Sequence, residues 1–208
     1  MDKKKLVIFD FDGVFINTAD LSFEIHQRVN PHFTFEQYSE ISNGNFHEKW
    51  QEAKVKHNLV ETGHEEFFKQ YEEGIFRYTI HDILHDAVLH LSDKYILVIV
   101  TSSSGPVVTN FINKENLGGC FSEILGYEFH KSKVVRIKSL FEKYNLLPTE
   151  AVFVTDTLGD IEEGNSCGVP VIAETWGLHN RELLQSGNPA VIIEDPRELV
   201  PTIEKILC

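Results

Sequence analysis

Two carboxylates follow a short apolar run near the beginning of the chain. Asp10 and Asp12 come directly after residues 6–9, and Gly13 follows them. The apolar run predicts a buried strand of a parallel sheet. Because an unpaired buried charge is costly, we expect both carboxylates in the crevice beyond the carboxyl end of that strand, where open α/β proteins bind ligands. Carboxylate oxygens in such a crevice are hard donors of the kind that suits Mg²⁺, and Gly13 lets a ligand approach the backbone closely.

Hydroxyl side chains follow the strongest apolar run of the sequence. Residues 95–100 predict a strand buried on both faces, and Thr101 and Ser102 come next, ahead of a predicted helix over about residues 105–115. Hydroxyls and free amides at a helix N-terminus can hold a phosphate group. Simple N-capping of the helix explains the same residues without any ligand.

Acidic and basic side chains recur at later strand and helix ends. Asp156 follows a predicted strand over residues 151–154, and Asp160 begins the next helix. Lys131 and Lys133 stand at the start of another helix, where the helix dipole disfavours a cation. Capping explains either carboxylate alone, but the carboxyl ends of parallel strands meet at one edge. Clustered carboxylates then need a divalent cation and a lysine to neutralise them, which predicts Mg²⁺ and a phosphate group at the edge shared by Asp10, Asp12, Thr101, Asp156 and Asp160.

Strands alternate with helices over most of the chain, which predicts an α/β fold with a parallel sheet covered by helices on both faces. From about residue 20 to residue 77 the periodicity is helical and no good strand occurs. We therefore expect a small helical insertion after the first strand. The remaining predicted elements are strands over residues 124–126, 169–173 and 190–193 and a last helix over about residues 196–206.

Composition excludes several classes of function. The chain has 208 residues and a formal net charge of -13, which argues against non-specific binding to nucleic acid or to an anionic membrane. No apolar stretch approaches the roughly 20 residues that a membrane-spanning helix needs. Cys120, Cys167 and Cys208 form no CxxC pair, so we expect reduced thiols in a cytoplasmic protein.

The order of these motifs resembles that of the haloacid dehalogenase (HAD) superfamily over essentially the whole chain. Residues 10–14 resemble motif I, residues 101–102 motif II, and residues 156–160 motif IV. Motif III is a lysine before the helix that contains Ile137; Lys133 is favoured, and Lys131 stays open. The resemblance implies a Rossmann-like core of residues 1–17 and 79–208 and a helical C1 cap of residues 18–78. It is closest to the phosphoglycolate-phosphatase and β-phosphoglucomutase-like branch, which residues 175–177, Thr-Trp-Gly, also resemble.

The resemblance implies a two-step phosphoryl transfer with a distinct role for each matching residue. Asp10 would attack phosphorus and form an aspartyl phosphate, and Asp12 would act as general acid and then as general base. Gly13 would keep the approach open. Mg²⁺ would be bound by Asp10, by the backbone carbonyl of Asp12 and by Asp156, with Asp160 binding directly or through water. The phosphoryl oxygens would be held by Thr101, Ser102 and Lys133.

Three functions are compatible with this reading. The first is a Mg²⁺-dependent phosphatase acting on a small phosphorylated metabolite, since a cap limits access to larger substrates. The second is a phosphomutase, which usually carries a cap-loop arginine, and no arginine stands near Gly44. The third is a non-catalytic phosphate-binding protein, which would not need a general acid at Asp12. Two positions depart from the family pattern, Asn17-Thr18 and Glu163-Gly164, and both bear on the substrate more than on the chemistry.

Overall fold

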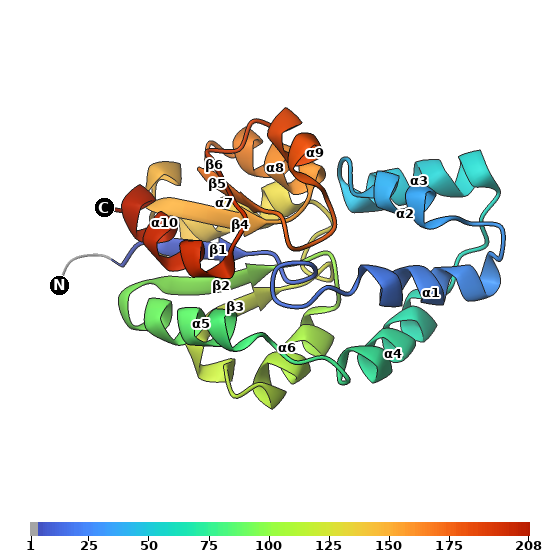
Figure 1. The fold of residues 1–208 in the computed structure, drawn as a ribbon, viewed down its shortest axis with the longest axis horizontal. Helices are drawn as coiled ribbons and strands as arrows, with labels where there is room; N and C mark the ends of the chain where they lie inside the picture. Colours follow the sequence, from blue (N-terminus) through green and yellow to red (C-terminus); the bar gives the residue numbers. More distant parts are fainter. Residues whose placement is uncertain (1–3) are drawn as a thin grey trace.

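A six-stranded, all-parallel sheet forms the centre of the molecule in a computed structural model that describes residues 4–208 (Figure 1). The strand order is β3-β2-β1-β4-β5-β6. This arrangement confirms the α/β fold expected from the sequence. The strands are β1 (Leu6–Phe9), β2 (Ile96–Val100), β3 (Phe121–Leu125), β4 (Ala151–Thr155), β5 (Val171–Glu174) and β6 (Val191–Ile193).

Strand β1 lies in the middle of the sheet and brings the motifs together. All four of its residues are buried, and Phe9 pairs with Ile99 of β2 on one side and with Val154 of β4 on the other. The strand order reverses between β1 and β4, which is the topological switch point where α/β folds bind ligands. Asp10 leaves the sheet at this point, and its backbone N–H donates to the Val154 carbonyl at 2.9 Å.

Helices cover both faces of the sheet, because alternate residues of each strand point to opposite sides. Val7 and Phe9 belong to the apolar cluster under α5 (Asp82–Lys94), α6 (Gly105–Lys114) and α10 (Leu199–Ile206). Leu6 and Ile8 belong to the cluster under α7 (Lys133–Tyr144), α8 (Leu158–Ser166) and α9 (Arg181–Ser186). A continuous apolar run such as β2 is explained by this double cover.

Four helices lie in sequence between β1 and α5: α1 (Ala19–Val29), α2 (Phe35–Ile41), α3 (Phe46–His57) and α4 (His64–Ile75). They lie together beyond the carboxyl ends of the strands (Figure 1). A separate apolar cluster around Phe33 and Trp50 holds α2 and α3, whereas Tyr71 and Ile75 of α4 belong to the cluster of the sheet. The division into a core of residues 1–17 and 79–208 and a cap of residues 18–78 stays a prediction, and residues 1–3 lie outside the described part.

Several element boundaries differ by one or more residues from the predicted ones. Strand β3 begins at Phe121, earlier than predicted, because its partly exposed edge position breaks the apolar run. Strand β5 begins after Pro170, which has no N–H to donate to a neighbouring strand, and it continues through Glu174. The last predicted helix is a 3₁₀ turn followed by α10. The three 3₁₀ turns are η1 (Gly118–Cys120), η2 (Pro148–Glu150) and η3 (Pro196–Glu198).

Candidate active site

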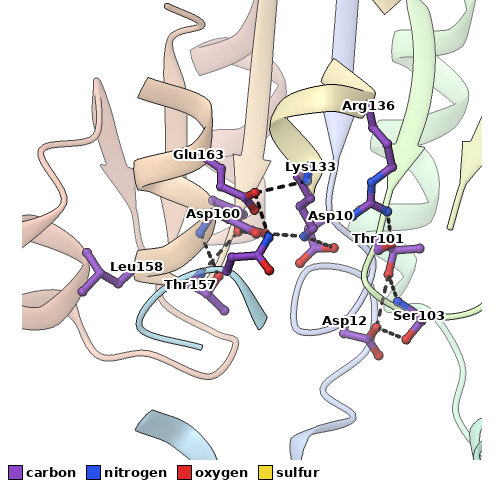
Figure 2. A network of polar contacts seen from close by, with 12 residues as sticks. Asp10, Asp12, Thr101, Ser103, Lys133, Arg136, Thr157, Leu158, Asp160 and Glu163 are labelled. Carbon is purple, nitrogen blue, oxygen red and sulfur yellow. Dashed lines mark hydrogen bonds and ion pairs between the residues drawn. The ribbon is translucent and has the colours of Figure 1, made fainter. Parts of the chain in front are cut away.

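A buried ion-pair cluster stands at the end of β1. The Lys133 Nζ lies 2.9 Å from Asp10 Oδ1 and 2.5 Å from Asp160 Oδ2 (Figure 2). Burial raises the pKa of Asp10 well above its usual range, and the Lys133 charge opposes this only in part. Burial works against the charge of Lys133, but Asp10 and Asp160 outweigh it and raise the lysine pKa. The cluster therefore holds one fixed cation against two carboxylates.

The structure distinguishes between the two candidate lysines. Lys133 is 2% exposed and begins α7, whereas Lys131 is exposed to solvent. Glu163 fixes this helix start, because its Oε1 accepts from the Lys133 N–H at 3.1 Å (Figure 2). The same oxygen accepts from Ser132 Oγ at 3.2 Å. A carboxylate at a helix N-terminus also offsets the dipole that disfavours Lys133 there. The unusual Glu163-Gly164 pair of the sequence thus has a local structural role.

Asp12 occupies a different environment from Asp10, although only Phe11 separates them. Its Oδ2 accepts from Ser103 Oγ at 2.6 Å and from Thr101 Oγ1 at 3.4 Å (Figure 2). Its Oδ1 accepts from the hydroxyls of Thr18 and Tyr71. Four hydroxyl donors therefore hold this carboxylate, one from α4, two from the loop after β2 and one from the loop before α1, and no lysine contacts it in the described structure.

The Asp156 carboxylate lies between two glycines. A Cβ added at Gly13, which has φ +85°, would stand 1.9 Å from Asp156 Oδ2, and one at Gly177 would stand 2.4 Å from it. Larger side chains at either position would displace the carboxylate. Asp156 Oδ2 accepts from the Leu178 N–H at 2.8 Å. Burial, with the nearby Asp160 charge, raises the pKa of Asp156 to about 7.

Glu174, at the end of β5, is a further buried carboxylate. It is fully buried, and its Oε2 accepts from the backbone N–H groups of Trp176 at 2.7 Å and Gly177 at 3.2 Å. Burial and the Asp156 charge raise the pKa of Glu174 well above its usual range. Sequence reasoning overlooked it, although it shows the same signal as Asp156, a carboxylate directly after an apolar strand. Trp176 in turn donates from Nε1 to the Val14 carbonyl at 3.1 Å and so braces motif I.

The loop between α2 and α3 is docked on the start of α8. The Gly159 N–H donates to the Ser42 carbonyl at 3.0 Å, and a Cβ on Gly159 would stand 2.2 Å from the Gly44 carbonyl oxygen. Asn45 Nδ2 donates to Glu163 Oε1 at 3.0 Å. Gly44 of this loop lines the cavity described next.

One cavity joins nearly all of the residues expected in the site. Its wall on the sheet side includes Ser102 and Ser103, which lie at the start of α6. Thr101 is fully buried behind this wall, and its Oγ1 accepts from the Ser103 N–H at 3.0 Å. Arg136 fixes this corner by donating from Nη1 to the Thr101 and Leu125 carbonyls. The other expected residues that line the cavity are Asp10, Asp12, Gly13, Lys133, Asp156 and Asp160.

The donor set of this cavity fits a divalent cation. Asp156 Oδ1 is buried and has no hydrogen-bond partner in the described structure, and the neighbouring carboxylates raise the pKa of Asp10 through their charge. A hard divalent ion would satisfy that oxygen and relieve this repulsion. Within residues 4–208, however, no group of three or more His, Cys, Asp and Glu side chains is placed so that it could hold a metal ion. The Asp160 carboxylate instead forms an ion pair with Lys133 and accepts a hydrogen bond from Thr155 Oγ1 at 2.9 Å.

The expected metal residues therefore do not all behave alike. All four line the cavity, but their partners differ. Lys133 pairs with both Asp10 and Asp160, hydroxyls hold the Asp12 carboxylate, and Asp156 Oδ1 has no hydrogen-bond partner in the described structure. The sequence pattern also overlooked Tyr71, because it lies in a helix whose apolar periodicity explains it as a packing residue. Ser103 was within the hydroxyl run of the sequence but could not be told apart from its neighbours.

Residues 7–174 match the model of the haloacid dehalogenase-like hydrolase family. The chain belongs to this family. A phosphoglycolate phosphatase of Synechococcus elongatus is 20% identical, over 97% of this chain and 98% of that protein. Pyrophosphatase PpaX of Bacillus mycoides is 22% identical, over 98% of this chain and 99% of that protein. A haloacid dehalogenase-like hydrolase of Streptococcus pneumoniae shares the fold with a TM-score of 0.77 at 17% identity, over 97% of this chain and 99% of that one.

Membership of this family confirms the resemblance expected from the motifs. Hydrolases of this family that act as phosphatases generally use a divalent metal ion. No helix of residues 4–208 has the length and hydropathy to cross a bilayer.

Proposed function

We propose that this chain is a Mg²⁺-dependent phosphatase that hydrolyses a small phosphomonoester through an aspartyl phosphate on Asp10. The observation that carries the proposal is the contrast between two carboxylates in one cavity: Asp10 is paired with Lys133, and Asp12 is held by hydroxyls. Two carboxylates in different environments can take different catalytic roles. The phosphatase names of the relatives and the hydrolase family confirm the enzyme class expected from the sequence.

In the first step the Asp10 carboxylate attacks phosphorus, the bond to the leaving oxygen breaks, and Asp12 gives its proton to that oxygen. Lys133 and the Ser102 backbone N–H hold the phosphoryl oxygens, and the start of α6 adds the positive end of its dipole. In the second step Asp12 takes a proton from water, which attacks the phosphorus of the aspartyl phosphate and releases free phosphate and Asp10. Thr101 supports Ser103 and Asp12 from behind the cavity wall.

Mg²⁺ would be held by Asp10, Asp156 and the backbone carbonyl of Asp12, with Asp160 as a direct or water-mediated ligand, and would neutralise the charge of the phosphoryl group. Gly13 and Gly177 leave room for the Asp156 carboxylate that this assignment requires.

Residues 18–78 act in this proposal as a cap domain over a core of residues 1–17 and 79–208. Contacts such as Gly159 N–H to the Ser42 carbonyl support a closed arrangement, which favours small metabolites as substrates. The named relatives act on phosphoglycolate or pyrophosphate, so a small substrate agrees with them too. Cys120, Cys167 and Cys208 are free thiols, which agrees with a cytoplasmic location.

The two other functions receive less support from the site. Lys133 is the one lysine or arginine among the described residues that line the cavity, so a second phosphate, as a phosphomutase holds, would lack a counter-charge. Structural similarity to a proposed β-phosphoglucomutase of Thermotoga maritima, with a TM-score of 0.68 at 19% identity, extends to the fold alone. A protein that only binds phosphate would have no need for an Asp12 carboxylate that is held in place by four hydroxyl donors.

Release of phosphate from a generic aryl phosphate and a metabolite panel tests this proposal, with Mg²⁺ and with a chelator. The wild type should release phosphate only with the metal, and Asp10→Asn should lose roughly 1,000-fold or more in kcat. Asp86→Asn, at an exposed position of α5, is the matched control and should keep full activity. Full activity of Asp10→Asn would overturn the nucleophile assignment. Isomerised sugar phosphate without release of phosphate would identify a mutase, and phosphate binding without any turnover would identify a binder.

A further inference from the structure

The cavity continues from the carboxylates to a wall of flat rings on the helical side. We call this surface the helical wall and define it by His26, His47, Trp50, Thr62, Phe67 and Phe68, all of which line the cavity. The His26 ring stacks on Phe67 at 4.7 Å with 22° between the planes, and it lies 4.2 Å from the Trp50 ring. Aromatic faces of this kind favour another flat ring over an alkyl chain.

The helical wall also contains polar atoms without partners. His26 Nδ1, His47 Nε2 and Thr62 Oγ1 are buried and have no hydrogen-bond partner in the described structure. His26 is only 7% exposed to solvent. A buried polar atom without a partner lowers stability, and three of them on one wall of one cavity indicate a polar ligand that supplies the missing hydrogen bonds.

The helical wall offers no positive charge to an anion. Burial lowers the pKa of both His26 and His47 to about 4, so both rings are neutral at neutral pH. Glu61 also lines the cavity, and its hydrogen bond with Lys54 lowers its pKa, so it is an anion. A carboxylate or a second phosphate placed here would lose its hydration and meet a like charge, which is unfavourable.

We propose that the alcohol released by this phosphatase is an uncharged group with a heteroaromatic ring, and that this ring packs against the helical wall. The inference rests on the proposed phosphatase function and assigns its substrate class. It separates this chain from relatives that are named for phosphoglycolate, whose leaving group carries a carboxylate.

A matched set of synthetic esters tests the substrate class on the wild type. The esters are pyridylmethyl phosphate, its ring-carboxylated derivative, propyl phosphate and phosphoglycolate. The kcat/KM for pyridylmethyl phosphate should exceed that for each of the other three by about tenfold or more. Equal or greater kcat/KM for phosphoglycolate or for the carboxylated ring would overturn the inference and leave the phosphatase function intact. No release of phosphate from any ester, a generic aryl phosphate included, would instead overturn the function.

Two variants test the wall itself. Phe67→Leu should lower kcat/KM for pyridylmethyl phosphate at least about fivefold more than for propyl phosphate, and equal losses would contradict ring packing. His64→Lys places a cation at an exposed position that lines the cavity, and it should raise the ratio of kcat/KM for the carboxylated over the neutral ring by about fivefold. Val55→Lys adds the same charge on α3 away from the cavity and should leave the ratio unchanged. An unchanged ratio in His64→Lys would contradict the charge argument.

Discussion

Lys133 and Asp10 form a buried ion pair, with Nζ 2.9 Å from Oδ1, at the carboxyl end of the central strand β1. Lys133 Nζ also lies 2.5 Å from Asp160 Oδ2, so a single ammonium pairs with one carboxylate 123 positions before it in sequence and with another 27 positions after it. Because burial favours the neutral form of Asp10, this cation opposes the rise in the pKa of the carboxyl group that we propose as the nucleophile. The pair thereby connects the fold to the proposed chemistry.

Replacing this cation should disable the site. Lys133→Gln leaves the two carboxylates without a counter-charge, so kcat should fall about 100-fold or more. Unfolding free energy in the absence of metal should fall by about 3 kcal/mol, as when one partner of a buried pair is removed. Lys131→Gln, two positions away and exposed, is the control and should change neither quantity. Urea titrations and steady-state kinetics measure both, and equal behaviour of the two variants would contradict the assignment of Lys133.

The hydroxyl of Tyr71 should position Asp12 for proton transfer. Tyr71→Phe keeps the ring but removes a donor to Asp12 Oδ1, so kcat/KM for an alkyl phosphate should fall about tenfold. An aryl phosphate has a good leaving group and needs less proton donation, so its loss should be smaller. Tyr38→Phe is the control, because Tyr38 is another buried tyrosine that lines the cavity but its hydroxyl does not hydrogen-bond Asp12. Equal losses for the two esters in Tyr71→Phe would show that the hydroxyl acts on packing alone.

Glu163 should hold the loop between α2 and α3 and the start of α7 at the same time. Glu163→Ala removes the acceptor of Asn45 Nδ2, Ser132 Oγ and the Lys133 N–H, so stability should fall by about 1–3 kcal/mol. Hydrogen exchange of residues 42–45 should become faster, because one of their contacts with the core is lost. Glu162→Ala, at the exposed neighbouring position, should leave exchange in this loop as it is in the wild type. Unchanged protection in Glu163→Ala would show that the loop docks through its backbone contacts only.

His26 should make the protein less stable in acid. Burial lowers its pKa from 6.5 to about 4, so between these values the unfolded chain binds a proton that the folded chain does not. The contribution of His26 to the unfolding free energy is complete above about pH 6.5. It is lost as the pH falls toward 4, by roughly 3 kcal/mol in total. His26→Gln should show a correspondingly smaller fall in unfolding free energy between neutral pH and about pH 4.5, whereas the exposed His32→Gln should behave as the wild type. An identical pH dependence of His26→Gln and wild type would mean that His26 titrates normally in the folded state.

Sequence patterns were sufficient for the sheet and for the residues at its edge. Continuous apolar runs such as β2 have few explanations besides a doubly covered strand, and parallel strands necessarily bring Asp10, Asp156 and Thr101 to one edge. The pattern could not show how each carboxylate is paired. Whether Asp12 faces Lys133 or a set of hydroxyls depends on side-chain directions and on Tyr71, which arrives from a helix 59 positions away.

The helical wall was beyond sequence reasoning for a related reason. His26 and Phe67 have the spacing of ordinary packing residues within their helices, and only the tertiary contact between α1 and α4 turns them toward one cavity. Glu174 is the opposite case, since its place after an apolar strand was visible in the sequence. The strand was expected to end at residue 173, which left Glu174 directly after it, and in the structure β5 continues through Glu174.

The most direct measurement is the mass of the Asp10 peptide after acid quench of the Asp12→Asn variant incubated with an aryl phosphate and Mg²⁺. Because the aryl group leaves without a general acid while the second step lacks its base, this variant should accumulate one phosphoryl group on Asp10. The Asp10→Asn, Asp12→Asn double variant should carry none. A phosphoryl group on any other residue, or turnover by a chain that lacks the Asp10 carboxylate, would contradict the account.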